Sequence, residues 1–252
     1  MSDKLQKVDS NTVSKTKTLS KLSIASGLTA GLAAGLSSIE LPRMFNQLVV
    51  FLLDGSGSMT YKGNSGFSKG NEVHQAVIKV LDRLNSSKNK SSFDLAFWAF
   101  SNEKVEMFPI KPVKDFNLAT DCFNPCEYIT DYSKTKLSDL LESVESQVNE
   151  YLEKYDGQNR KALIIILGDG EIHDYSDAIR YKKDIDKNSL VTFSTILFES
   201  PDWQDRFAQQ KIDDLKKSFS ELASTEADYL STVDPEKIRS HMINSVTKVS
   251  KI

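Results

Sequence analysis

The chain has 252 residues, which is enough for one large domain or two small ones. Its formal net charge is −3, which gives no reason to expect nucleic acid as a partner. Its two cysteines, Cys122 and Cys126, cannot build a disulfide framework, and they leave either one local bridge or two free thiols. Because the three histidines lie far from both cysteines in the sequence, a four-ligand zinc site is not expected. The absence of a disulfide framework leads us to interpret the protein as cytoplasmic.

The first 41 residues differ in composition from the rest of the chain. Residues 1–21 are rich in Lys, Ser and Thr, which predicts disorder. Residues 22–39 carry no charge and contain a Gly-Leu-x-x repeat, which as a helix would place leucines in a stripe beside a row of glycines. We therefore expect residues 1–41 to form a disordered or partner-docking arm, with docking or self-assembly through residues 22–39. A targeting element is the third alternative for this segment, although it follows a polar lead that contains Asp3 and Asp9. We do not expect membrane contact, because this segment is weakly apolar and slightly short for a span.

From residue 42 onward, strand and helix patterns alternate along the chain. Short apolar runs indicate buried strands, and apolar residues at three- and four-residue spacing indicate helices. The alternation predicts one α/β domain over residues 42–252, with a doubly wound, mostly parallel sheet, one antiparallel edge strand and helices on both faces. The expected strands are 48–54, 93–100, 104–108 (the antiparallel edge), 162–167, 190–198 and 228–232, and the expected helices are 69–86, 134–155, 175–186, 205–223 and 235–249.

Two of the expected strands end in an aspartate beside a glycine. Asp54 closes the first strand and opens the turn Asp54-Gly-Ser56-Gly-Ser58, and Asp169 follows the strand at 162–167. Because ligands of such sheets bind beyond the carboxyl ends of the strands, we expect both aspartates at one edge. Carboxylate and hydroxyl oxygens suit Mg²⁺ or Mn²⁺ better than zinc, so the pattern predicts a divalent-cation site.

The order and spacing of these residues resemble the von Willebrand factor A domain, whose cation site is the metal-ion-dependent adhesion site. Asp54-x-Ser56-x-Ser58 resembles the first motif of the family, and Gly168-Asp169-Gly170 resembles the last one. The middle motif is a threonine just before a helix, and the run Thr135-Lys-Leu-Ser-Asp-Leu-Leu is similar to it. The resemblance covers roughly residues 44–249.

This resemblance implies a specific set of metal ligands. Ser56, Ser58 and Thr135 would bind the ion through their hydroxyls, and Asp54 and Asp169 would hold it largely through bound waters. The resemblance further implies that the sixth position takes an Asp or Glu side chain from a partner protein.

The chain departs from the pattern of the family at two places. The usual glycines before the middle threonine are missing, so Thr130 or Ser133 are alternatives to Thr135 as the third hydroxyl ligand. Gly168 replaces the usual threonine beside the last aspartate. The start at residues 41–44 is also similar to TerY-like bacterial members, which are linked to tellurite and stress resistance and are thought to act as cytoplasmic scaffolds.

We therefore expect a non-enzymatic protein-interaction module that depends on Mg²⁺, or on Mn²⁺ or Ca²⁺ in its place. The alternative is a phosphatase or phosphotransferase similar to haloacid dehalogenases, with Asp54 as nucleophile. That chemistry needs a second aspartate as general acid two positions later, where this chain has Ser56. Two further interpretations are that the serines cap a helix, or that the glycine turn binds a nucleotide, although Gly55-x-Gly57 lacks a third glycine.

Overall fold

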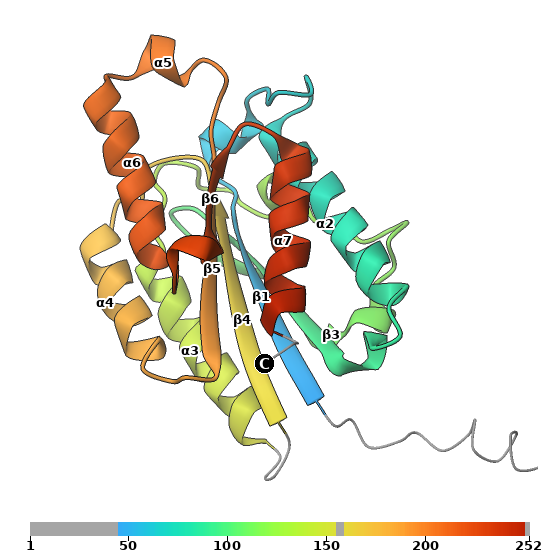
Figure 1. Cartoon of the computed structure of the whole chain (residues 1–252). Coiled ribbons are helices and arrows are strands. Elements are labelled where there is room, and N and C mark those ends of the chain that lie inside the picture. The colour runs from blue at the N-terminus through green and yellow to red at the C-terminus, as the bar shows by residue number, and fades with distance from the viewer. Residues whose placement is uncertain (1–44, 155–158, 250–252) are drawn as a thin grey trace, which may run out of the picture. The chain divides into compact units, whose positions relative to one another are not determined.

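The computed structural model describes residues 45–154 and 159–249, so the predicted arm at residues 1–41 lies outside the described residues. The described part forms a six-stranded sheet in the order β3-β2-β1-β4-β5-β6 (Figure 1). All neighbouring strands are parallel except β2 and β3, which confirms the predicted antiparallel edge. The strands are β1 (Phe45–Asp54), β2 (Phe93–Phe100), β3 (Lys104–Pro112), β4 (Asn159–Gly168), β5 (Val191–Phe198) and β6 (Tyr229–Thr232); the helices are α2 (Lys69–Asn85), α3 (Ser138–Glu153), α4 (Tyr175–Ile185), α5 (Trp203–Arg206), α6 (Gln209–Leu222) and α7 (Pro235–Val249).

The two central strands, β1 and β4, each contain an unbroken run of six apolar residues. Every residue from 48 to 53 and from 162 to 167 is fully buried, as expected for strands that are covered on both faces. Leu53 of β1 pairs with Leu167 of β4, so the two strands end at the same edge of the sheet. From β1 the strands are added toward β3 on one side, and from β4 they are added toward β6 on the other side. The strand order therefore reverses between β1 and β4, and sheets of this kind bind ligands at the carboxyl edge of that switch point.

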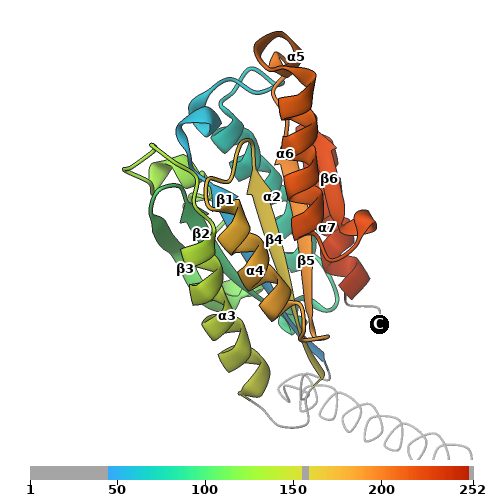
Figure 2. The same ribbon diagram turned by 90° about the vertical axis from the view of Figure 1, so that its left-hand side faces the viewer.

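Helices cover both faces of the sheet, as predicted. On one face, α2 and α7 pack against the sheet through side chains such as Val77 and Met242. On the other face, α3, α4 and α6 form the layer seen in front of the sheet in Figure 2, with Leu141, Ala178 and Phe219 in its core. The doubly wound architecture is thereby confirmed.

Two helices differ from the prediction. The helix expected at residues 134–155 begins only at Ser138, because the preceding residues are held in a loop by contacts described below. The single helix expected at residues 205–223 is divided into α5 and α6. Phe207 and Ala208 are extended at the break, with ψ angles of 143° and 146°, while Trp203 at the start of α5 is buried.

Cys122 and Cys126 are both free thiols, so they form no local disulfide bridge. Burial, followed by the nearby Asp54 and Asp169 carboxylates, raises the pKa of the Cys126 thiol to about 12. Such a thiol stays protonated and is a poor nucleophile or metal ligand at neutral pH. Within residues 45–154 and 159–249, every helix is too short or too polar to span a bilayer.

Candidate metal site

A chain of polar contacts joins the first and last motifs at the carboxyl edge of the sheet. The backbone N–H of Ser56 donates to Oδ1 of Asp54 at 2.7 Å, and the hydroxyl oxygens of Ser56 and Ser58 lie 3.1 Å apart. The Ser58 hydroxyl then donates to Oδ1 of Asp169 at 2.5 Å, across a sequence separation of 111 residues. The structure therefore brings four of the five predicted ligands together by direct contacts.

The serines do not serve as helix caps. Ser56 precedes a single 3₁₀ turn, Gly57–Thr60, but its side chain makes no capping hydrogen bond to that turn. Its hydroxyl contacts Ser58 instead. The capping interpretation is therefore wrong for Ser56, and the hydroxyl is directed toward the acidic residues of the edge.

Asp54 is the carboxylate of the site whose burial is least offset by hydrogen bonds. It is 1% exposed, and its Oδ2 atom is buried without a hydrogen-bond partner among the described residues. Burial, followed by the charge of Asp169, raises the pKa of Asp54 from 3.8 to about 7. A buried carboxylate oxygen without a partner is costly, and a cation bound beside it would remove that cost. This unpartnered oxygen, next to two hydroxyls and a second carboxylate, fits a hard divalent cation.

The remaining candidate, Thr135, is fixed to the loop that follows Asp169. Its backbone N–H donates to Nδ1 of His173 at 3.1 Å, and its carbonyl accepts from the backbone N–H of His173 at 2.8 Å. Because His173 stands only four residues after Asp169, these two bonds tie the middle motif to the last one. Thr135 is also buried, at 5% exposure.

The two alternatives to Thr135 have other surroundings. Thr130 is exposed, and both its N–H and its hydroxyl donate to Oε1 of Glu103, at 2.5 and 2.8 Å. Ser133 is exposed as well, and its N–H donates to Oδ1 of Asp131. Of the three hydroxyl residues, Thr135 is thus the one that is buried beside the Asp169 loop.

Three residues outside the predicted ligand set shape this edge: Lys69, which sequence reasoning missed, and His173 and Asp174, which it interpreted as part of a solvated loop. Asp174 accepts hydrogen bonds from the N–H groups of Leu137 and Ser138 at 2.8 to 3.1 Å and therefore caps α3 from a separate loop. Lys69, the first residue of α2, donates to Oδ2 of Asp169 at 2.6 Å. A lysine at the first position of a helix opposes the helix dipole, which is the one signal in the sequence that would have pointed to it.

Gly168 has a steric reason to replace the threonine of the family. A Cβ atom at this position would lie 3.0 Å from Cζ of Phe219 and 3.1 Å from Oδ2 of Asp54. Both distances are shorter than ordinary van der Waals contacts. The glycine thus allows α6 and the Asp54 carboxylate to approach the end of β4 closely.

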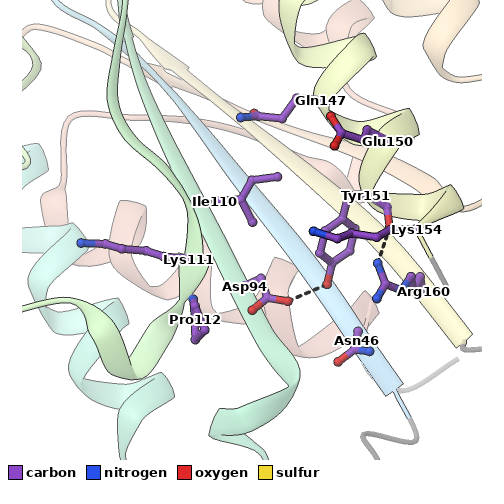
Figure 3. A pocket seen from close by; sticks show the side chains of 10 residues that line it. All are labelled: Asn46, Asp94, Ile110, Lys111, Pro112, Gln147, Glu150, Tyr151, Lys154 and Arg160. Carbon is purple, nitrogen blue, oxygen red and sulfur yellow. Dashed lines mark hydrogen bonds between the residues drawn. The ribbon is translucent and has the colours of Figure 1, made fainter.

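In the described part of the chain, no three His, Cys, Asp or Glu residues are grouped as metal ligands. A metal at this edge would therefore depend on hydroxyl oxygens beside two carboxylates, which is the donor set of the three motifs. A separate hollow of about 620 Å³ lies at the opposite, amino edge of the sheet (Figure 3). There the Tyr151 hydroxyl donates to Asp94 at 2.9 Å. That edge is not where ligands of parallel α/β sheets bind.

The von Willebrand factor type A domain model matches residues 49–236. The chain belongs to this family. The resemblance drawn from the three motifs is thereby confirmed, and domains of this family typically mediate protein–protein interactions through a metal-ion-dependent adhesion site. The proposed similarity to the TerY-like subgroup is a finer statement that the match does not address. A search of curated proteins gave no significant match.

Solved structures of the same fold come from varied sources. Proximal thread matrix protein 1 from the mussel byssus, solved with a zinc-occupied metal-ion-dependent adhesion site, is 17% identical with a TM-score of 0.54, over 81% of this chain and 46% of that one. The pilus adhesin SpaC from Lactobacillus rhamnosus GG is 11% identical with a TM-score of 0.62, over 82% and 31%. BatB from Bacteroides thetaiotaomicron is 14% identical with a TM-score of 0.56, over 82% and 100%. This chain thus spans less than half of the first two, and at these identities the likeness concerns the fold.

Proposed function

We propose that this domain binds a partner protein through a divalent cation held at the carboxyl edge of the sheet. Ser56, Ser58 and Thr135 would hold the ion through their hydroxyls, and Asp54 and Asp169 through bound waters. The observation that carries the proposal is the buried, unpartnered Oδ2 of Asp54 beside the serine hydroxyls that contact Asp169. When bound, the cation would supply an open coordination position for an Asp or Glu side chain.

Hydroxyl and carboxylate oxygens favour Mg²⁺, with Mn²⁺ or Ca²⁺ as alternatives. The mussel protein holds zinc at its own adhesion site, and we therefore include zinc among the ions to be tested here. An octahedral ion that keeps some of its waters suits a site with weak hydroxyl ligands, because such a site exchanges its last ligand readily.

The surface around the site supports a protein partner. Four of the five large hydrophobic side chains that are exposed in the described part are aromatic residues of the surrounding loops: Tyr61, Phe67, Tyr132 and Phe207. Tyr61 and Phe207 line a cavity of about 190 Å³ together with Asp169. Exposed aromatic residues are enriched in protein interfaces, where they often contribute much of the binding energy.

We infer that the domain has no catalytic activity of its own. The haloacid-dehalogenase alternative needs a general acid two residues after Asp54, and a serine hydroxyl cannot serve as one at neutral pH. The family match gives that alternative no support. Phosphatase turnover of p-nitrophenyl phosphate that disappears in Asp54→Asn would favour the enzyme instead. We retain as a proposal a cytoplasmic scaffold with a role in stress response, on the similarity of residues 41–44 to TerY-like members.

The experiment is a capture assay with the full chain immobilised, using a lysate of cells that express it. We expect wild type to retain a partner in Mg²⁺, to release it in EDTA, and to lose capture in Asp54→Ala. Asp177→Ala, which removes an exposed carboxylate on α4, is the matched control and should keep capture. Circular dichroism establishes that each variant is folded. Capture that survives both EDTA and Asp54→Ala would contradict the proposal.

A further inference from the structure

A buried lysine shares the candidate metal site with the two aspartates. The Nζ atom of Lys69 lies 2.6 Å from Oδ2 of Asp169, and the two side chains are 1% and 0% exposed. The same Nζ atom lies 5.9 Å from the centroid of the Phe198 ring, so the ammonium also faces an aromatic ring. Removing an ammonium from water is costly, and a partner must offset that cost. Asp169 is that partner.

The two oxygens of Asp169 are therefore both engaged within the protein. Oδ1 accepts from the Ser58 hydroxyl, and Oδ2 accepts from the Lys69 ammonium. Asp54 is different, because its Oδ2 has no hydrogen-bond partner among the described residues. The two carboxylates of the site therefore differ in their partners. Among the described residues, Asp169 forms an ion pair with Lys69, whereas Oδ2 of Asp54 has no hydrogen-bond partner.

This arrangement fixes the charge of the site when a metal is bound. Two carboxylates and one ammonium leave a single negative charge, so a divalent cation brings the site to one net positive charge. Without Lys69 the same cation would make the site neutral. Excess charge in a buried site is unfavourable, and an incoming carboxylate removes it.

We propose that Lys69 couples metal binding to acid binding, by weakening the site for the metal alone and strengthening it for the metal together with a carboxylate. The inference rests on the proposed function, because it assigns a role to a residue of the same site. The two events then favour each other, since each ligand binds better when the other is present. A partner that presents an acid would therefore be captured together with the ion.

The position of Lys69 supports this role over a purely structural one. As the first residue of α2, it lies where the helix dipole disfavours a positive charge. Its side chain lines the cavity of about 190 Å³ that it shares with Ser58 and Asp169. The ammonium is thus placed beside the candidate ligands, at a position where the ion pair with Asp169 offsets its unfavourable surroundings.

The test measures Mg²⁺ binding by titration calorimetry, in saturating sodium acetate and in sodium chloride of equal ionic strength. Acetate is the probe for the carboxylate of the partner. The variants are Lys69→Met, which removes the charge, and Lys69→Gln, which keeps a neutral donor for Asp169 in case the methionine variant does not fold. Lys211→Met is the matched control, because Lys211 lines the same cavity but pairs with the exposed Glu171 at 2.5 Å.

For wild type we expect weak Mg²⁺ binding in chloride and clearly tighter binding in acetate. In the Lys69 variants we expect Mg²⁺ to bind in chloride at least about tenfold more tightly than in wild type, with the gain from acetate largely lost. Lys211→Met should behave like wild type. Thermal melting in EDTA establishes that each variant is folded.

The other outcomes separate this inference from the proposed function. If wild type and the Lys69 variants bind Mg²⁺ with the same affinity and the same gain from acetate, the coupling role is wrong while the metal site stands. If none of the proteins binds Mg²⁺, Mn²⁺ or Ca²⁺, the proposed function fails as well. Metal binding by the variants but not by wild type would overturn both, because Lys69 would then take the place of the ion.

Discussion

Asp174 links the candidate metal site to the stability of the fold, and its replacement by alanine is a stringent test of the contacts described above. Its carboxylate accepts hydrogen bonds from the N–H groups of Leu137 and Ser138 and from the Ser138 hydroxyl at 2.5 Å. These groups belong to the start of α3, directly after Thr135. Asp174→Ala therefore removes the cap of a helix and loosens the loop that carries the third candidate ligand.

The size of the effect follows from the bonds that are lost. Two N–H groups at the first turn of α3 lose their acceptor, and a net contribution of about 0.5–1.5 kcal/mol per bond gives about 1–3 kcal/mol. Asp174 is half-buried, so water replaces part of the loss, and we expect a decrease in the free energy of unfolding of about 2 kcal/mol. In a domain of this size this corresponds to a decrease of about 4–8 °C in melting temperature.

Urea unfolding followed by circular dichroism measures this loss, and calorimetry on the same samples measures Mg²⁺ affinity, which we expect to fall as well. Asp177→Ala is the matched control. It removes a carboxylate three residues later that is 58% exposed and pairs only with an exposed arginine, so its cost should stay below about 0.5 kcal/mol. Equal losses for the two variants would refute the reasoning, because the cap would then contribute nothing beyond general surface charge.

Two further predictions concern Gly168 and His241. Gly168→Thr, which restores the usual residue of the family, should cost about 1–3 kcal/mol of unfolding free energy because its Cβ would crowd Phe219. Phe219→Leu in the same chain should recover part of that cost. If urea unfolding shows that the losses of the two single variants simply add in the double variant, this explanation is wrong. Burial lowers the pKa of His241 below 6.5, and its Nε2 lies 3.0 Å from the Ser194 hydroxyl. The unfolded chain therefore binds more protons in acid, so the unfolding free energy should fall as the pH decreases below about 6.5, and more steeply in wild type than in His241→Gln. Identical slopes between pH 7.5 and 5.5 would show that His241 does not contribute.

The two central strands of this fold were predictable because residues 48–53 and 162–167 are continuous apolar runs, as expected for strands of a sheet that is covered on both faces. The run at residues 162–167 indicated β4, and the structure extends it to Asn159–Gly168. Glycine turns after β1 and β4 indicated the ligand-binding edge for the same reason, since each one directly follows a buried strand. The candidate ligands Asp54 and Asp169 were found from these local signals.

What the sequence did not reveal depends on contacts between distant segments. The start of α3 is set by Asp174, which lies 36 residues after Ser138, and periodicity alone placed that start four residues too early. The division between α5 and α6 arises where the chain extends at Phe207 and Ala208, although the spacing of apolar residues continues through the break. Lys69 was not singled out from the sequence, because nothing in its neighbourhood in the sequence indicates a buried acid 100 residues away.

The central claim is that hydroxyl and carboxylate oxygens from three distant motifs hold one hard divalent cation. The most direct measurement is the melting temperature of the full chain during titration with Mg²⁺, compared between wild type and Ser58→Ala. Binding to the folded state alone raises the melting temperature by mass action, so we predict a rise that continues with Mg²⁺ concentration in wild type and is largely absent in the variant. The same melting temperature at all millimolar concentrations of Mg²⁺, Mn²⁺ and Ca²⁺, or an equal rise in the two proteins, would contradict the account.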